Sequence, residues 1–315
     1  MATITADHIA SVSLKDADSN PDEFAEKLGR SFEDYGFAII ADHDIPDELI
    51  HRAEEKAKAF FALPEAVKKT YFLANGGGQR GYTPFGIETA KGAKAHDLKE
   101  FWHVGRDLPA GHPFRSHMPD NVWPSEVPSF KDTFTELFAT FDRTGLKVLR
   151  AIARYLKIDE DYFADTVRDG NSILRALHYP PQSEPTGQHI RAGAHEDINT
   201  ITLLLGAEEA GLELLTKDGR WIPVSPKPGE LVINIGDMLQ RLTNGRLRST
   251  SHRVVNPRPD RASHARYSMP FFLHFRSDYL IEALPGTVAA GEEPKWPPIT
   301  AHDYLQERLR EIKLV

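Results

Sequence analysis

The sequence predicts a mainly β protein with helices, in which an antiparallel sandwich or jelly roll follows a helical region. Three observations predict it. From Ser172 onward, short apolar runs alternate with turn signals and no long helix separates them. Asp218-Gly219 lies between two apolar segments, which is typical of a tight hairpin. Residues 128–156 carry apolar side chains three or four positions apart, the period of one long helix.

The first third of the chain is expected to be mainly helical. Asn20-Pro21 begins an amphipathic helix that Gly36 ends, and residues 37–41 form a short apolar strand. A second helix begins at Pro46-Asp47, and a short one follows Pro64. The glycine cluster of residues 75–81 is expected to be a loop, and residues 82–123 to be irregular.

The long helix 128–156 is expected to pack along a sheet as a scaffold, and residues 301–314 to form a charged amphipathic helix. The expected strands are 172–179, 199–206, 212–216, 221–224, 230–236, 252–255 and 266–275. One compact domain is expected over 1–315. Residues 1–120 are expected to be an N-terminal region that contributes to a substrate pocket, and residues 121–165 to be scaffold helices. Residues 172–280 are expected to form the jelly-roll core with the metal site, and residues 281–315 a C-terminal extension.

Composition excludes several classes of protein. The 315 residues carry a net charge of −8 without a long basic run, which argues against nucleic acid as a partner. The absence of cysteine excludes disulfides, cysteine nucleophiles and cysteine-ligated metals. No apolar run is long enough to span a membrane, and no basic region precedes an apolar one at the N-terminus, so a cytoplasmic location is expected. Nothing in the sequence indicates the oligomeric state.

Any metal must therefore bind histidine or carboxylate side chains. His195 and Asp197 lie two positions apart and would share one face of a strand. His252 follows after about four strand segments, enough chain to return beside them in an antiparallel roll. Two histidines and one carboxylate would occupy one face of an octahedral metal, a set suited to non-haem Fe(II). Taken singly, each residue is equally compatible with a surface strand or a satisfied core histidine.

Arg266 and Ser268 would also share a strand face, where a guanidinium beside a hydroxyl suits a carboxylate. Fe(II), one aspartate, dianionic 2-oxoglutarate and Arg266 together carry no net charge, which makes their burial tolerable. Tyr179 could add a phenol donor to the same co-substrate. Alone, Arg266 could form an ordinary surface ion pair, and Tyr179 could be a strand-end aromatic.

Together these motifs resemble the isopenicillin N synthase-like branch of the Fe(II)/2-oxoglutarate-dependent dioxygenases. The similarity covers nearly the whole chain. It includes "YGFAII.DHDIPDELI", "FFALPEAVKKTY", "GQRGYTPFGIETAKG", "DLKEFWHVG", "LRALHYPP", "HEDINTITLLL", "DGRWIPVSPKPGELVINIGDMLQRLTNGRLRSTSHRVVNP" and "RYSMPFF".

The resemblance implies a double-stranded β-helix, a jelly roll with helices outside. It implies that His195, Asp197 and His252 are the iron ligands. It also implies that Arg266 and Ser268 bind the distal carboxylate of 2-oxoglutarate beside Tyr179. The chain departs from many plant relatives at Leu177, where they carry Asn, and in a longer interval from His252 to Arg266, expected to be a hairpin through 257–264.

The implied reaction consumes O₂ and 2-oxoglutarate, releases succinate and CO₂, and most simply hydroxylates a small molecule. Isopenicillin N synthase has the same triad and Arg-x-Ser pair but uses no 2-oxoglutarate, so an oxoacid-independent oxidase or cyclase is the alternative. A zinc hydrolase or a catalytically silent ligand-binding relative would be further alternatives. The sequence does not separate hydroxylation from desaturation, ring closure or fragmentation.

The substrate is expected to be an amino acid or another small carboxylate. Glu88 could pair with an ammonium or guanidinium group and Arg276 with a carboxylate, although both could equally be surface residues. The candidate substrate residues are Tyr82, Phe85, Glu88, Lys99, Trp102, Gln240, Phe272, His274 and Arg276. The segment 76–78 could be a lid hinge or a plain loop.

Overall fold

A computed structural model describes residues 9–73, 79–87, 99–181, 191–205, 211–256 and 263–311. Within them, the main sheet has eight strands in the order β1-β2-β10-β7-β12-β5-β4-β3. In that order the strands are Ser11–Ser13, Phe37–Ala41, Leu231–Ile235, Ile201–Leu205, Arg266–Leu273, Ile173–Tyr179, Glu100–Gly105 and Gly81–Thr83. All neighbouring pairs are antiparallel except β1 and β2.

A second sheet has the order β6-β11-β8-β9, formed by Ala192–His195, His252–Val254, Leu212–Leu215 and Trp221–Pro223. It packs on the main sheet through a small apolar cluster that includes Ile39 and Val232 from the main sheet and Leu214 from the second. Two facing antiparallel sheets form a jelly roll, which confirms the predicted fold class. A third, two-stranded sheet pairs β13 (Leu280–Ile281) with β14 (Ile299–Thr300).

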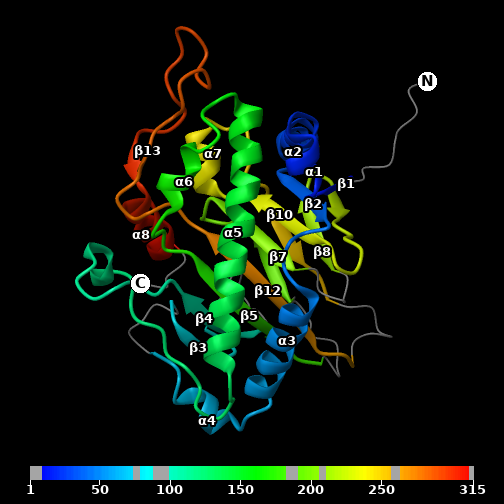
Figure 1. Ribbon diagram of the computed structural model, residues 1–315, viewed down its shortest axis with the longest axis vertical. Coiled ribbons are helices and arrows are strands. Elements are labelled where there is room, and N and C mark those ends of the chain that lie inside the picture. The colour runs from blue at the N-terminus through cyan, green and yellow to red at the C-terminus, as the bar shows by residue number, and fades with distance from the viewer. Residues whose placement is uncertain are drawn as a thin grey trace.

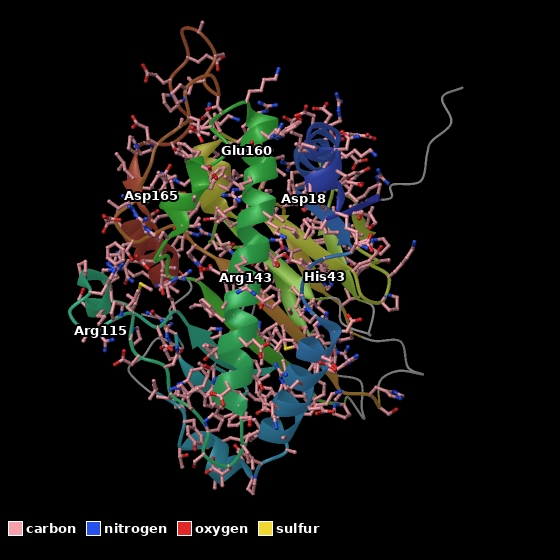
Figure 2. The ribbon with its side chains drawn as sticks, viewed as in Figure 1. Asp18, His43, Arg115, Arg143, Glu160 and Asp165 are labelled. Atoms are coloured by element: carbon pink, nitrogen blue, oxygen red, sulfur yellow. The ribbon has the colours of Figure 1, made fainter. Side chains whose placement is uncertain are left out.

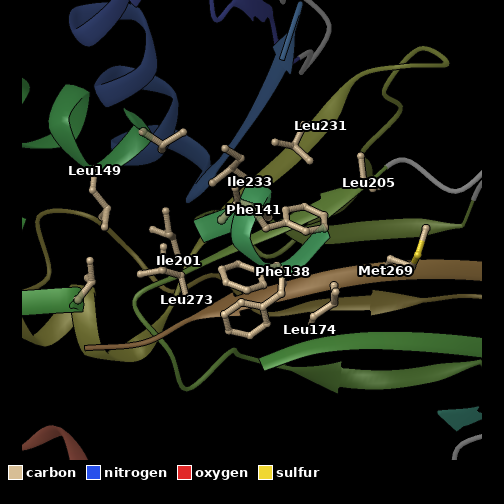
Figure 3. Close-up of a cluster of buried hydrophobic side chains, with 14 of the residues drawn as sticks. Phe138, Phe141, Leu149, Leu174, Ile201, Leu205, Leu231, Ile233, Met269 and Leu273 are labelled. Carbon is tan, nitrogen blue, oxygen red and sulfur yellow. The ribbon is translucent and has the colours of Figure 1, made fainter. Parts of the chain in front are cut away.

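The main sheet has two chemically different faces because successive side chains alternate. The outer face is apolar and packs on α5 (Phe130–Leu156), with Phe138 and Phe141 of the helix against Leu174, Ile201 and other strand residues (Figure 3). The face toward the second sheet, called the inner face below, carries Thr202, Asn234, Ser268 and other polar residues. The larger hydrophobic core therefore lies outside the roll, and the inside holds a smaller apolar cluster beside these polar residues.

The helices α2 (Pro21–Tyr35) and α3 (Asp47–Phe61) flank α5 on the outer side of the sheet (Figure 1). Exposed charged side chains such as Arg143 cover the solvent side of α5 (Figure 2). The remaining helices are α1 (Asp16–Ser19), α4 (Glu65–Lys69), η1 (Pro113–Ser116), α6 (Tyr162–Val167), α7 (Asp237–Leu242) and α8 (Ala301–Glu311). None of the described helices is both long and apolar enough to cross a membrane.

The predicted helices and strands appear with small shifts at their ends, but one region was predicted wrongly. Residues 82–123 contain β4, the edge-side neighbour of β5, and part of β3. All six residues of β4 are buried, so the strand lacks the polar alternation that would mark it in the sequence. The division into regions stays a prediction, and residues 257–262 of the expected hairpin lie outside the described residues.

Candidate metal centre and its surroundings

His195, Asp197 and His252 meet between the second sheet and the main sheet. β6 ends at His195, and β11 pairs with it in antiparallel register so that His252 lies opposite His195. One ligand atom from each of the three residues lies within 4.8 Å of the others, and within the described part of the chain no other group of three or more His, Cys, Asp or Glu residues does so. Asp197 lies in the turn after β6 rather than in the strand itself, so strand alternation does not place it.

Hydrogen bonds orient the carboxylate of Asp197. Its Oδ2 accepts from Thr202 Oγ1 at 2.5 Å and from Asn234 Nδ2 at 2.8 Å. Its Oδ1 faces Nε2 of His195 at 3.8 Å and Nε2 of His252 at 3.9 Å. One carboxylate oxygen is thus held by the sheet, and the other is directed to the space between the two imidazoles.

Backbone carbonyls orient both imidazoles. Nδ1 of His195 lies 2.7 Å from Gly193 O, and Nδ1 of His252 lies 3.0 Å from Thr250 O. Because a carbonyl oxygen can only accept, each Nδ1 carries a proton, and Nε2 is then the nitrogen whose lone pair is free in the neutral ring. Metal-binding histidines are commonly fixed by this kind of contact.

The electrostatics favour the forms that bind a cation. Burial, followed by the neighbouring His252, lowers the pKa of His195 to about 4, so the ring is neutral at neutral pH. Burial raises the pKa of Asp197, but the two imidazoles and the Asn234 and Thr202 hydrogen bonds outweigh it, and the net pKa is lowered. Two imidazole nitrogens and one carboxylate oxygen converge here, the ligand set of a non-haem iron oxygenase with open positions for substrates. This donor set fits Fe(II).

The residues predicted to hold the co-substrate lie on the inner face of the main sheet. Arg266 of β12 is opposite Tyr179 of β5, and Ser268 is opposite Leu177. Arg266 and Ser268 are 4% and 5% exposed, and the Arg266 guanidinium lies 5.1 Å from the centre of the Tyr179 ring. Leu177 packs with Phe101 and Tyr179 and offers no hydrogen bond through its side chain.

Three of the predicted substrate residues reach this interior. Lys99 is 8% exposed and lies close enough to His195 to lower the pKa of that ring. Phe272 lies on the inner face beside Thr202. His274 is buried, its Nδ1 faces Phe272 O at 3.1 Å, and burial lowers its pKa to about 4.

Tyr82 and Trp102 require a correction. They form a cross-strand pair on the outer face and are 1% and 0% exposed in the core, where both pack on Phe60. The Tyr82 hydroxyl donates to Glu100 Oε2 at 2.5 Å. Strand alternation turns both rings away from the metal side, so neither lines the inner face.

Three further candidates have their described contacts or exposure away from the metal centre, and their roles as substrate residues stay predictions. Arg276 pairs at the surface with Asp165 of α6, which is labelled in Figure 2, and with Asp278. Gln240 accepts a hydrogen bond from the Ser249 backbone at 3.0 Å, and Phe85 is 43% exposed. Glu88 and the segment 76–78 lie outside the described residues.

Sequence reasoning missed Arg175, Phe101 and His103 on the same inner face. His103 is opposite Arg175 in the β4–β5 register, and Arg175 Nε donates to His103 Nε2 at 2.5 Å. The Arg175 guanidinium lies 4.1 Å from the Phe101 ring and 5.3 Å from the Phe272 ring. The alternation of Arg175 with Leu177 and Tyr179 could have indicated this placement.

Comparison with known proteins agrees with the class defined by the fold and the ligand set. Residues 9–126 match the family described as the non-haem dioxygenase in morphine synthesis N-terminal region, and residues 170–275 match the 2OG-Fe(II) oxygenase superfamily. A 2-oxoglutarate-Fe(II) type oxidoreductase, hxnY of Emericella nidulans, is 34% identical over 90% of this chain and 83% of its own. The chain therefore belongs to the Fe(II)/2-oxoglutarate-dependent dioxygenases, in their isopenicillin N synthase-like branch.

Solved structures agree. A protein of Caulobacter crescentus assigned to the 2OG-Fe(II) oxygenase family is 58% identical, with a TM-score of 0.91 over 96% of this chain and 99% of its own. A full-length Neurospora crassa protein, solved in complex with alpha-KG and thymine, is 30% identical, with a TM-score of 0.87 over 98% of both chains.

The chain is thus an oxidoreductase that uses Fe(II) and 2-oxoglutarate. This membership favours the oxoacid-dependent reaction over the oxoacid-independent oxidase and removes the zinc hydrolase and the silent ligand-binding protein.

Proposed function

We propose that His195, Asp197 and His252 bind the Fe(II), and that Arg266 and Ser268 bind the distal carboxylate of 2-oxoglutarate with Tyr179 beside it. The observation that carries the proposal is the convergence of the three ligand atoms within 4.8 Å, with the Asp197 carboxylate hydrogen-bonded to Thr202 and Asn234 of the inner face. Arg266 and Ser268 lie on the same face, on the strand that neighbours the one carrying Thr202. Iron and co-substrate would therefore share one enclosed surface.

The protein orients the metal ligands, compensates the charge of the co-substrate and excludes water from the site. Bound iron with 2-oxoglutarate supplies O₂ activation coupled to oxidative decarboxylation, with succinate and CO₂ as products. The Thr202 and Asn234 hydrogen bonds keep Oδ1 of Asp197 directed at the metal position. Arg266 compensates the charge of the co-substrate, since the metal, Asp197, the dianion and the guanidinium together are neutral. Burial of Arg266 and Ser268 excludes water from the carboxylate they bind.

The proposed reaction is hydroxylation of a small molecule carrying a carboxylate, such as an amino acid. Lys99, Arg175 and His103 supply positive or hydrogen-bonding groups on the inner face, and Phe101 and Phe272 supply flat apolar surface. A surface of this kind suits a small ligand with an acidic or carbonyl group. Binding of thymine by the Neurospora crassa protein supports a small-molecule substrate. The cytoplasmic location and the absence of a nucleic-acid partner stay predictions from the sequence.

An anaerobic titration tests the assignment of both cofactors. Fe(II) and then 2-oxoglutarate are added to metal-free protein, and the visible charge-transfer band of the chelate is recorded in wild type and in Arg266→Ala. The proposal expects a band in wild type that is weaker in the variant at the same co-substrate concentration. A protein that binds iron but shows no band would contradict the 2-oxoglutarate assignment, and Arg266 would then be a substrate ligand.

A further inference from the structure

Arg80 is a buried cation whose hydrogen-bonding capacity is mostly unused. It precedes β3, and the whole residue is 1% exposed. Its Nη1 donates to the Gln79 carbonyl at 2.8 Å, whereas Nε and Nη2 have no hydrogen-bond partner. A buried guanidinium with two unpaired nitrogens destabilises the fold, because no hydrogen bonds compensate for its lost hydration.

A glycine makes room for this side chain. A Cβ placed on Gly105 would lie 1.8 Å from Cζ of Arg80 and 2.1 Å from its Nη2. The guanidinium therefore lies flat against the side of Gly105 on which a side chain would project. Any other residue at position 105 would displace the charged head.

The register of the sheet connects this position with the metal centre. Gly105 is opposite Ile173, Phe272 is opposite both Ile173 and Thr202, and Thr202 donates to Asp197. With strands ~4.8 Å apart, three steps along this row span roughly 14 Å. His103, which contacts Arg175, is two residues before Gly105 on the same strand face. Arg80 thus extends the basic side of the inner face away from the metal.

Neighbouring carboxylates do not neutralise the head by direct contact. Asp107 and Asp120 act on Arg80 only through space, and each is hydrogen-bonded elsewhere, Asp107 to Asn121 and Asp120 to Arg115. Burial lowers the pKa of Arg80 to about 10, so the side chain is still charged at neutral pH. An acidic group of a bound ligand would supply hydrogen-bond acceptors for the unpaired nitrogens of Arg80.

We propose that Arg80 binds the acidic group of the substrate and selects carboxylates whose oxidised carbon lies toward the iron end of the inner face. The fork of a guanidinium matches a carboxylate with two parallel hydrogen bonds, and Nη2 and Nε form one such edge. The inference rests on the proposed function and adds to it the residue that selects the substrate class.

The first test compares stability in the absence of substrate. Met has a similar volume and no charge, and replacing an unpaired buried charge by an apolar side chain is neutral or stabilising. Arg80→Met should therefore melt at or above the wild-type temperature. The matched control is Arg106→Met one residue after Gly105, because Arg106 is paired with Asp142 at 2.8 Å and with Gly170 O at 2.9 Å. That variant should melt several degrees lower, and an equal loss in Arg80→Met would overturn the proposal by making Arg80 structural.

The second test measures ligand selection on the anaerobic Fe(II)–2-oxoglutarate enzyme. The probes are phenylacetate, 3-phenylpropionate and 4-phenylbutyrate, each beside its primary amide, and binding is followed by perturbation of the chelate band. Wild type should respond to at least one acid and not to its amide, and Arg80→Met should bind that acid about ten- to a hundredfold more weakly. Gly105→Ala, which keeps the charge but displaces the head, should show the same loss.

Wild type that responds equally to acids and amides, or to neither, would overturn the inference. An acid response of unchanged strength in Arg80→Met would also overturn it. The chelate band distinguishes failure of the proposed function from failure of the role proposed for Arg80. Its absence in wild type would refute the proposed function, whereas a normal band without acid selectivity would refute only the role of Arg80.

Discussion

The hydroxyl of Thr202 donates a 2.5 Å hydrogen bond to Oδ2 of Asp197. Thr202 is on the central strand β7, and Asp197 is in the turn that follows β6 of the other sheet. This contact joins the two sheets at the metal centre and leaves the second carboxylate oxygen for the metal. The orientation of the ligand set is therefore a property of the sheet packing and not of the ligand residues alone.

Thr202→Val should weaken metal binding without unfolding the protein. Valine keeps the shape but removes the donor, and loss of such outer contacts typically costs about 10–100-fold in metal affinity. Anaerobic Fe(II) titration measures the effect, with Thr216→Val in the exposed β8–β9 hairpin as control. Unchanged iron affinity in Thr202→Val would mean that Asn234 alone holds the carboxylate.

Arg266→Ala should raise the KM for 2-oxoglutarate by about 30–100-fold, because an anion taken out of water would lose its charged partner. Arg266→Lys should recover part of the loss, since it keeps the charge but not the fork. Steady-state succinate release at varied 2-oxoglutarate gives both values. Arg253→Ala is the control, as Arg253 pairs with Glu213 on the second sheet. A KM that stays at the wild-type value would assign Arg266 to another ligand.

The sequence predicted the parts of the site that depend on residue type and spacing, and missed those that depend on which strands become neighbours. His195, Asp197 and His252 could be found because the residue types and their spacing resemble a known family. Thr202 and Asn234 could not, because a threonine and an asparagine in apolar strands carry no signal until β7 and β10 pair in register.

Tyr82 and Trp102 were predicted to be substrate residues, and the strand pairing again shows why the sequence could not place them. Both lie in motifs that resemble the family's pocket-forming region, yet whether a strand residue faces the core or the interior depends on a one-residue phase. β4 itself was unpredicted because it is buried on both faces. Arg80 lies in a motif that was recognised, but its unpaired burial is visible only in three dimensions.

Glu100 should stabilise the fold at neutral pH through a network on the outer face. Its Oε2 accepts from Lys68 Nζ at 2.7 Å, and its Oε1 lies 2.7 Å from His178 Nδ1. Burial raises the pKa of Glu100, but His178, Lys68 and Tyr82 outweigh it, and the net pKa lies below the unfolded value of 4.5. A lowered folded pKa gives stability that is complete above about pH 4.5 and is lost as the pH falls through the folded value.

Glu100→Gln should therefore cost about 2–4 kcal/mol at pH 7, and the difference from wild type should shrink below about pH 4. Urea unfolding at a series of pH values measures it. Glu65→Gln, which removes an exposed pair with Lys69, should show little effect at any pH. A difference that does not vary with pH would show that the charge of Glu100 is not what stabilises the network.

Phe271→Ala should cost about 3–5 kcal/mol, because it leaves a cavity between the main sheet and α5. Phe271 is fully buried, and its ring is stacked 5.3 Å from that of Phe141. Phe85→Ala, at a side chain exposed to 43%, should stay within about 0.5 kcal/mol of wild type. Chemical unfolding measures the free energy of unfolding of both variants. Equal decreases would contradict the placement of the hydrophobic core between the main sheet and α5.

The central claim is that this chain couples 2-oxoglutarate decarboxylation to O₂ through iron held by His195, Asp197 and His252. The most direct measurement is succinate release from 2-oxoglutarate, with and without Fe(II) and O₂, in wild type and in Asp197→Ala of verified fold. Succinate release should require both iron and O₂ in wild type and should be abolished in the variant. Substantial iron-dependent release in Asp197→Ala, or release that continues without O₂, would contradict it.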